Sequence, residues 1–268
     1  MHLNDFVAAL ERVAPLALAE DWDNVGLLLA PSGPRSICRA LFTIDLDLEV
    51  AREAVELSAD IVVAYHPPIF SGCKRIVPSD VTGRTVLELL ENKIAVYSPH
   101  TALDAIDGGV NDWLVAAFDS ADSVAIAAKG ELVGQPGHPR IGQGRRLSLA
   151  TPLDFDSAVQ RVKAHLGLPF VRIASPFELD HPIRTVAACP GAGGSVITQV
   201  RADLYLTGEM RHHDLLRARA MGSHVILTEH SNSERGYLRV FTRRLGEQLS
   251  EEVELLISTR DHDPLRVV

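Results

Sequence analysis

Three clusters of polar side chains each come directly after a short apolar run that predicts a strand. The first cluster contains His66, the second contains His100 and Asp104, and the third contains His230 and Glu234. Imidazole nitrogens combined with carboxylate oxygens suit Zn²⁺, Mn²⁺ or Fe²⁺, whereas Mg²⁺ and Ca²⁺ favour oxygen ligands. We therefore predict that these residues bind divalent metal ions, one or two per chain, with Asp104 or Glu234 as a candidate bridge between two ions.

Each cluster also has an ordinary structural explanation. A histidine in front of a proline, as at His66, is common in loops, and the pairs His100/Asp104 and His230/Glu234 could be polar side chains at the start of a helix. The shared position after a strand favours the metal site, because open α/β sheets bind ligands at the carboxyl ends of their strands. If the three strands are parallel neighbours, the five side chains converge in one pocket.

Three further segments carry weaker signals. Glu209 also follows a predicted strand and is a candidate catalytic residue that moves protons, although a polar helix start explains it equally well. The glycine-rich segment 189–195 could bind an anion or could form a tight turn from strand to helix. Segment 21–26 could place a carboxylate near a pocket, or it could be a turn anchored by Trp22.

Alternating strands and helices must position these clusters. The alternation predicts two α/β lobes with mixed sheets covered by helices, over residues 1–125 and 126–268, with the metal site at the carboxyl ends of the strands between them. Glycines and prolines in 129–144 indicate a loop or lobe boundary. The expected strands are 25–29, 40–44, 61–64, 94–97, 147–150, 186–189, 204–207, 225–227 and 253–257, and the expected helices are 4–19, 47–57, 85–91, 110–118, 157–166, 213–219 and 234–249.

Composition excludes several classes of protein. The chain has 268 residues, 46% of them hydrophobic and 23% charged, which is enough for a large buried core and excludes disordered and fibrous proteins. A net charge of −9 disfavours direct nucleic-acid binding. No apolar run approaches the roughly 20 residues that span a bilayer, and no signal peptide is evident. Three scattered cysteines indicate reduced thiols, so we expect a cytoplasmic protein without membrane association.

The same motifs, in this order along almost the whole chain, resemble those of one known family. The resemblance is to the GTP cyclohydrolase 1 type 2 family, also described as NGG-one-interacting-factor-three-like or dinuclear metal centre hexameric proteins. The matching motifs are DWDNVGL at 21–27, YHPPIF at 65–70, SPHTALD at 98–104, GVNDWL at 109–114, GEM at 208–210 with two histidines at 212–213, HSNSERG at 230–236 and DHDP at 261–264.

The resemblance implies two α/β lobes, a toroidal homohexamer and a pair of divalent metals facing an internal cavity in each subunit. It also implies that the middle domain of longer members is missing. The implied metal ligands are His66, Asp104, His230 and Glu234, with His100 a ligand or a close neighbour of the ligands. Many members have a histidine where this chain has Tyr65, so we expect a weaker second metal position and a tyrosine that borders the pocket without coordinating.

A site with two divalent metals is suited to hydrolysis. The family name implies opening of the guanine ring of GTP, but no sequence motif here recognises guanine, and a nucleotide or phosphoester-like substrate fits two-metal chemistry equally well. We therefore predict a metal-dependent hydrolase with a small-molecule substrate, which assembles with copies of itself. The alternative is a non-catalytic, metal-stabilised oligomeric scaffold or adaptor, in which protein ligands would close the metal's coordination sphere.

Overall fold

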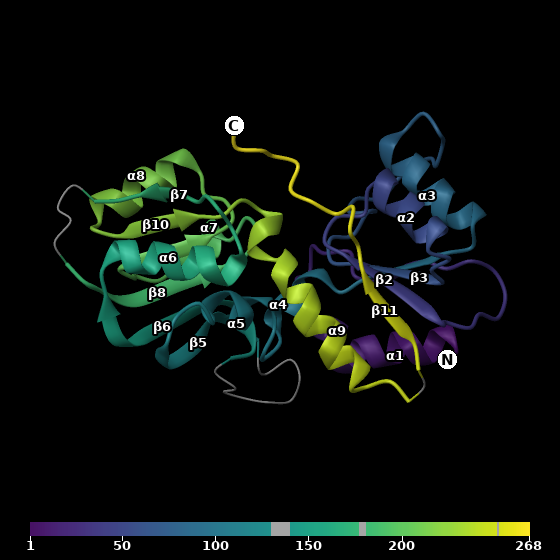
Figure 1. The fold of residues 1–268 in the computed structure, drawn as a ribbon, viewed down its shortest axis with the longest axis horizontal. Helices are drawn as coiled ribbons and strands as arrows, with labels where there is room; N and C mark the ends of the chain where they lie inside the picture. Colours follow the sequence, from purple (N-terminus) through teal and green to yellow (C-terminus); the bar gives the residue numbers. More distant parts are fainter. Residues whose placement is uncertain (130–139, 177–180, 251) are drawn as a thin grey trace. The chain divides into compact units, whose positions relative to one another are not determined.

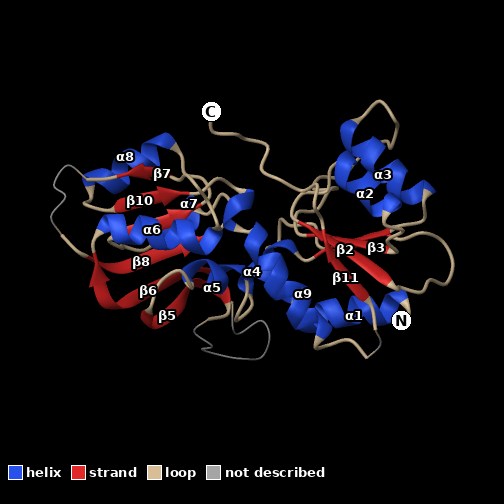
Figure 2. Cartoon of the chain, viewed as in Figure 1, coloured by secondary structure: helices blue, strands red, loops and turns tan. Residues whose placement is uncertain are grey.

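The computed structural model describes residues 1–129, 140–176, 181–250 and 252–268 (Figures 1 and 2). The chain divides into two compact units, and each unit contains one β-sheet with helices on its faces. The first unit consists of Met1–Leu103 and Tyr237–His262, and the second consists of Asp104–Gly236 and Asp263–Val268. Within the described residues, no helix has both the length and the apolar character needed to cross a membrane.

The first unit has a five-stranded sheet of mixed direction. Its three central strands are buried along their length because helices cover the sheet, which explains their nearly continuous Val, Ile, Leu and Ala sequences. Four strands are parallel, and β1 runs antiparallel to β4. The order across the sheet is β1 (Gly26–Leu29), β4 (Ala95–Ser98), β3 (Ile61–Ala64), β2 (Arg39–Thr43) and β11 (Glu254–Ile257).

Two pairs of helices cover this sheet, as the right half of Figure 1 shows. Helices α2 (Leu48–Glu56) and α3 (Val81–Glu91) pack against each other over one face, where Val62 is among the buried side chains. On the other face α9 (Leu238–Gly246) packs on α1 (Leu3–Val13), β2 and β11. Successive side chains of each strand point to opposite faces of the sheet, so each strand contributes apolar side chains to the core under both pairs of helices.

The second unit has a six-stranded sheet. Strands β8, β9 and β10 are parallel neighbours, whereas β5, β6 and β7 run antiparallel to the strands beside them. The order is β5 (Ser120–Ala128), β6 (Gly142–Leu153), β8 (Ile183–Cys189), β9 (Leu204–Thr207), β10 (His224–Leu227) and β7 (Arg172–Ala174). The carboxyl ends of the three parallel strands therefore share one edge.

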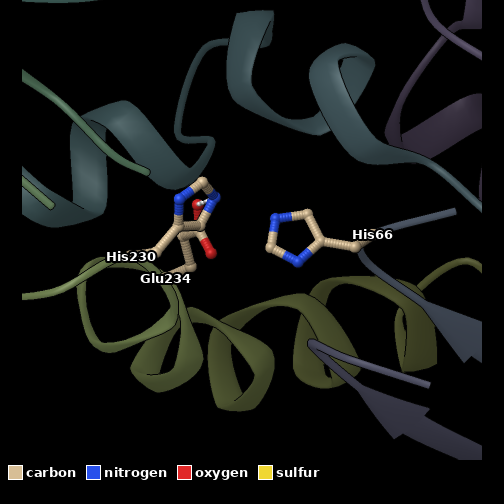
Figure 3. A group of neighbouring side chains, drawn as sticks. All are labelled: His66, His230 and Glu234. Carbon is tan, nitrogen blue, oxygen red and sulfur yellow. Dashed lines mark ion pairs between the residues drawn. The ribbon is translucent and has the colours of Figure 1, made fainter. Parts of the chain in front are cut away.

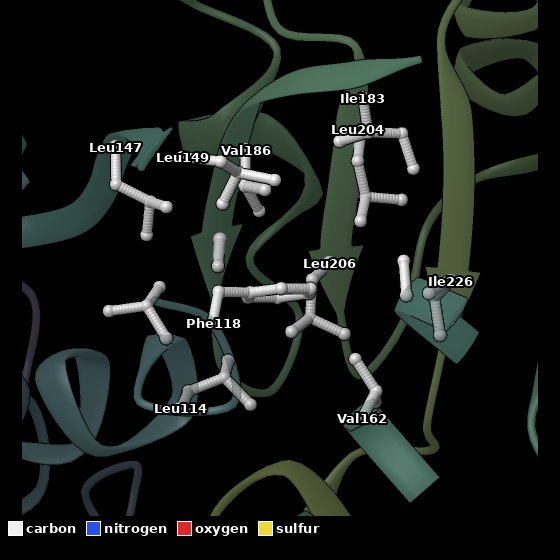
Figure 4. Close-up of a cluster of buried hydrophobic side chains, with 13 residues drawn as sticks. Leu114, Phe118, Leu147, Leu149, Val162, Ile183, Val186, Leu204, Leu206 and Ile226 are labelled. Carbon is white, nitrogen blue, oxygen red and sulfur yellow. The ribbon is translucent and has the colours of Figure 1, made fainter. Parts of the chain in front are cut away.

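Two apolar clusters form the core of the second unit. In the first, strand residues such as Val186 and Leu204 pack with α5 (Val110–Val115) and α6 (Phe155–Leu166) (Figure 4). The second cluster lies on alternate residues of the same strands and includes side chains of α7 (Gly194–Ile197) and α8 (His212–Ala220). The sheet is thus covered on both faces.

Several predicted boundaries differ from the structure. The helix expected over 4–19 ends at Val13, because Pro15 disfavours helical geometry at the preceding residue. The helix expected over 234–249 begins only at Leu238, after two short 3-10 turns. The sequence does not predict β5 or β7, nor the short helices α4 (His100–Ala105) and α7.

The division into units also differs from the expected lobes 1–125 and 126–268. The boundary at 125/126 falls inside β5, which pairs with β6 in the second unit. Strand β11 pairs with β2, so residues near the end of the chain complete the first sheet. Most of the expected boundary loop 129–144 lies outside the described residues, and its last three residues begin β6.

Candidate metal centre

His66 and His100 lie side by side in the first unit. Each follows a strand, β3 and β4 respectively, as the sequence predicts, and these strands are parallel neighbours. The two ring centroids are 5.3 Å apart. We call these two residues the imidazole pair. His100 has a φ of +31°, an unusual value for a residue other than glycine, and such strained positions concentrate at functional sites.

Each ring of the imidazole pair is held by an aspartate. His66 Nδ1 lies 2.9 Å from Asp45 Oδ1, and His100 Nδ1 lies 2.7 Å from Asp23 Oδ1. A proton on Nδ1 that is donated to a carboxylate makes Nε2 the acceptor nitrogen, which is the arrangement of many metal-binding histidines. When Nδ1 of each neutral ring donates to its aspartate, Nε2 is the nitrogen that can bind a cation.

Further hydrogen bonds fix the side chain of Asp23, and Thr43 Oγ1 donates to the backbone carbonyl of Asp45 over 2.8 Å. Burial alone would raise the pKa of Asp23, but the hydrogen bonds from His100 and Thr101 outweigh it and lower that pKa below its usual value. Next to Asp45, the backbone N–H of Ile44 donates to Asp261 Oδ2 over 2.7 Å. Sequence analysis missed Asp45, although its place two residues after β2, a parallel neighbour of β3, could have identified it.

The second unit contributes His230 and Glu234, which follow β10 (Figure 3). His230 Nδ1 lies 2.8 Å from Glu209 Oε1, so Glu209 orients His230 as the aspartates orient the imidazole pair. His230 Nε2 lies 3.7 Å from Glu234 Oε1. Glu209 follows β9, the parallel neighbour of β10, and the residue before His230, Glu229, has a φ of +67°.

The second unit also contains Asp104, a further candidate metal ligand, which lies on α4. Its side chain is buried, as is that of Glu234, and Asn111 Nδ2 donates to its backbone carbonyl over 3.1 Å. Burial raises the pKa of the Cys189 thiol, and the negative charges of Asp104 and Glu234 raise it further. Both carboxylates thus act on the same buried thiol. We call Asp104, Glu209, His230 and Glu234 the acidic cluster.

The glycine-rich segment 189–195 forms a tight turn against this cluster. Gly191 has a φ of +57°, and its N–H donates to Ser233 Oγ over 2.8 Å. A Cβ at Gly191 would lie 2.6 Å from Glu234 Oε1 and 2.9 Å from His230 Nε2. Only glycine leaves room there for the carboxylate and the imidazole to approach each other, so the backbone forms a cradle around the two candidate ligands.

The donor set fits a divalent metal ion. Burying a carboxylate is unfavourable unless a cation or hydrogen-bond donors compensate its charge, and Glu234 is only 2% exposed and Asp104 only 8%. By ligand type, His230 and Glu234 in the second unit are candidate metal ligands, and so is His66 in the first unit (Figure 3). The condition under which the sequence brings all five side chains into one pocket, that the three strands are parallel neighbours, holds for β3 and β4 but not for β10, which lies in the second sheet.

Comparisons with known proteins point to one family. A family model described as Duf34/NIF3 (NGG1p interacting factor 3) matches residues 1–264. The Protein NIF3 homolog of Schizosaccharomyces pombe is 42% identical over 266 residues, which are 96% of this chain and 94% of that protein.

Two solved structures share the fold. A Bacillus cereus protein related to NIF3 superposes with a TM-score of 0.88 at 20% identity, covering 100% of this chain and 99% of that chain. Reduced HcgD from Methanocaldococcus jannaschii superposes with a TM-score of 0.80 at 24% identity, covering 96% and 97% of the two chains.

Proposed function

Because the chain belongs to the Duf34/NIF3 family, we propose that it is a metal-dependent hydrolase that acts on a nucleotide or phosphoester-like substrate. The observation that carries the proposal is the set of three histidines, His66, His100 and His230, each with Nδ1 on a carboxylate. Histidines with a purely structural role need no such uniform orientation. The same orientation in two separate units is the pattern of ligands prepared for a metal.

We propose that His66, His230 and Glu234 bind one divalent ion together, with His100 and Asp104 as further ligands. Connectivity of the chain supports this grouping. Helix α4 begins with His100 in the first unit and carries Asp104 in the second. Residues four apart on a helix lie on one face, about 6 Å apart along its axis. The chain thus ties the imidazole pair to the acidic cluster through a single helical turn.

The residues of this chain then have distinct tasks in hydrolysis. A bound divalent ion supplies Lewis acidity and makes water more acidic. Asp104 and Glu234 supply the negative charge that balances the ion. Glu209 holds His230 through one oxygen, and because its side chain is 52% exposed, it is the carboxylate best placed to accept a proton from solvent or substrate.

We further propose a homohexamer in the cytoplasm. The resemblance to hexameric family members supports the assembly, and the three cysteines, all of them free, support a reducing compartment. A sedimentation mass close to that of one 29.1 kDa chain at micromolar concentration would contradict the hexamer.

The decisive experiment is metal analysis of the purified protein, followed by a hydrolysis screen of nucleotides and phosphoesters with and without that metal. Replacing both His230 and Glu234 by alanine is expected to remove metal and activity together. The double variant His213→Ala/Asp214→Ala is a matched control, because it removes a histidine and an acid from α8 in the same unit. Bound metal without turnover of any substrate would favour the scaffold, and unchanged metal content in the first variant would refute the assignment.

A further inference from the structure

Two large aromatic side chains are exposed beside the imidazole pair in the first unit. Trp22 is 61% exposed and Phe70 is 53% exposed. Their ring centroids are 6.0 Å apart with the planes inclined at 52°, and each ring also contacts His100, at 6.1 Å and 6.4 Å. We call Trp22 and Phe70 the aromatic pair. Its exposed surface adjoins a proposed metal ligand.

The backbone next to each ring is held in place. Asp23, directly after Trp22, accepts hydrogen bonds from His100 and Thr101. Asn24 Nδ2 donates to the carbonyl oxygen of Ile69, the residue before Phe70, over 2.5 Å. The segment that carries Trp22 is therefore fastened both to α4 and to the loop that carries Phe70. Hydrogen bonds at the neighbouring residues fix the two aromatic positions before any ligand arrives.

Leaving two fixed aromatic rings in water is unfavourable because their apolar surface stays hydrated, and a ligand that covers them would remove that cost. A flat ring fits best, because aromatic surfaces attract other π-systems in stacked or edge-to-face arrangements. Tyr65, whose ring centroid is 5.5 Å from that of His100, extends the aromatic surface towards the buried side.

We propose that the aromatic pair binds the heteroaromatic base of a nucleotide substrate. The site therefore selects base-containing substrates over simple phosphoesters. This inference rests on the proposed hydrolase function, since it specifies the substrate class of that site. The ligand is a small molecule because the rings adjoin His100, where the reacting group of the substrate would lie. Every base has a π-face, so stacking alone selects nucleotides as a class and does not specify one base.

Trp22 provides the measurement, because base stacking on an exposed indole quenches its fluorescence. The experiment titrates metal-free full-length protein with adenosine, guanosine, cytidine and uridine 5′-monophosphates, excited at the red edge of tryptophan absorption. Ribose 5-phosphate is the matched probe without a base. We expect saturable quenching by the nucleotides and none by ribose 5-phosphate. The Trp22→Phe variant identifies the signal, because it retains Trp113 and should show no quenching.

Three variants test the role of Phe70. Phe70→Ala should weaken nucleotide binding about tenfold, in line with the loss of one stacking contact, whereas Phe70→Tyr should preserve binding. Phe170→Ala is the matched control, because Phe170 is 63% exposed in the second unit, and it should bind nucleotides as the unmodified protein does. Equal binding of ribose 5-phosphate and nucleotides, or full binding by Phe70→Ala, would overturn the proposal.

The outcome is separable from that of the hydrolase proposal. Quenching in metal-free protein tests base binding alone, whereas the His230→Ala/Glu234→Ala variant tests the metal site alone. If Phe70→Ala instead changes the sedimentation mass and leaves nucleotide binding intact, the aromatic pair is a contact between subunits and the inference is wrong.

Discussion

The imidazole pair and the acidic cluster share one arrangement, a histidine held by a carboxylate, in different surroundings. In both, a carboxylate holds Nδ1 of a histidine at 2.7–2.9 Å. The imidazole pair lies among aromatic rings, whereas the acidic cluster has buried carboxylates and a glycine turn against it. Under the proposed function, the two sets of residues divide the work: the first unit shapes the substrate side and the second supplies the charge that retains a cation.

The largest expected effect concerns the buried ion pair that supports the acidic cluster. Arg145 is fully buried and binds Asp112 through two hydrogen bonds of 2.8 Å. Asp112 lies in the first turn of α5, directly after Asn111, whose side chain donates to the backbone carbonyl of Asp104. Asp112→Asn should lower the free energy of unfolding by about 3 kcal/mol, because it leaves a buried guanidinium without its counter-charge. Urea denaturation would measure this loss, and a change below about 0.5 kcal/mol would contradict it.

The contribution of the Asp112–Arg145 ion pair to stability should depend on pH. Burial would raise the pKa of Asp112, but its hydrogen bond and ion pair with Arg145 prevail and lower that pKa below 3.8. The stabilisation is therefore complete above about pH 3.8 and is lost as the pH falls through the depressed pKa. Denaturation measured along a pH series should show stability falling at acidic pH more steeply in the unmodified protein than in Asp112→Asn. Parallel curves would contradict this assignment.

Gly191→Ala should disrupt the acidic cluster and spare the imidazole pair. The new Cβ would lie under 3.0 Å from Glu234 Oε1 and His230 Nε2, so metal affinity should fall at least about 100-fold, which is about 2.7 kcal/mol. Calorimetric titration with Zn²⁺ would measure it. The control is Gly167→Ala, because Gly167 has a similar φ of +69° with nothing within 4 Å of its Cβ position. That variant should cost about 1–2 kcal/mol of stability and leave metal affinity unchanged.

Substituting the aspartates that hold the imidazole pair should have a smaller effect on metal affinity than Gly191→Ala. Asp45→Asn and Asp23→Asn should each weaken metal affinity about 10-fold to 100-fold, because the amide no longer fixes the tautomer of its histidine. Asp60→Asn is the matched control, since Asp60 accepts hydrogen bonds only from backbone N–H groups at the start of β2 among the contacts described. Equal metal affinity in Asp45→Asn and Asp60→Asn would show that the imidazole pair does not bind the ion.

The smallest effect is expected at Tyr65, which is 3% exposed with its ring against His66 and His100 at 4.9 Å and 5.5 Å. Tyr65→Phe should leave metal content within about twofold, because a neutral phenol near pH 7 is a poor ligand. Tyr65→His should raise occupancy of the weaker metal position. A Tyr65 oxygen within about 2.3 Å of a metal in a crystal structure would show direct coordination instead.

Local pattern predicts the buried strands well. Strand β3 occupies the predicted residues 61–64, and β2 and β4 lie within one residue of the predictions, because a helix-covered parallel strand is a continuous apolar run. Strand β7 escapes prediction because it has only three residues, of which Ile173 is 57% exposed. The pairing of β11 with β2 joins residues more than 200 positions apart, and no local pattern encodes it.

The candidate site was predictable where one sheet determines it. The sequence predicts that His66 and His100 each follow a strand, and they lie together because these two strands are parallel neighbours. The carboxylates that orient the histidines are harder to predict. The sequence shows that Asp45 is an aspartate in a loop, but it does not show whether its side chain faces solvent or a histidine. Whether the strand before His230 is a neighbour of the other two stays open in the sequence, because hydrophobic periodicity encodes neither strand direction nor sheet membership, and β10 lies in the second sheet.

The return of β11 to β2 sets an order of events during synthesis. All the residues of the second sheet, whose last strand in sequence is β10, are synthesised before Glu254–Ile257. Until then β2 is an unprotected sheet edge, whose free N–H and C=O groups can pair with other strands. The second unit can therefore complete its sheet first, and the first unit is the part of the nascent chain with the greater need for a chaperone.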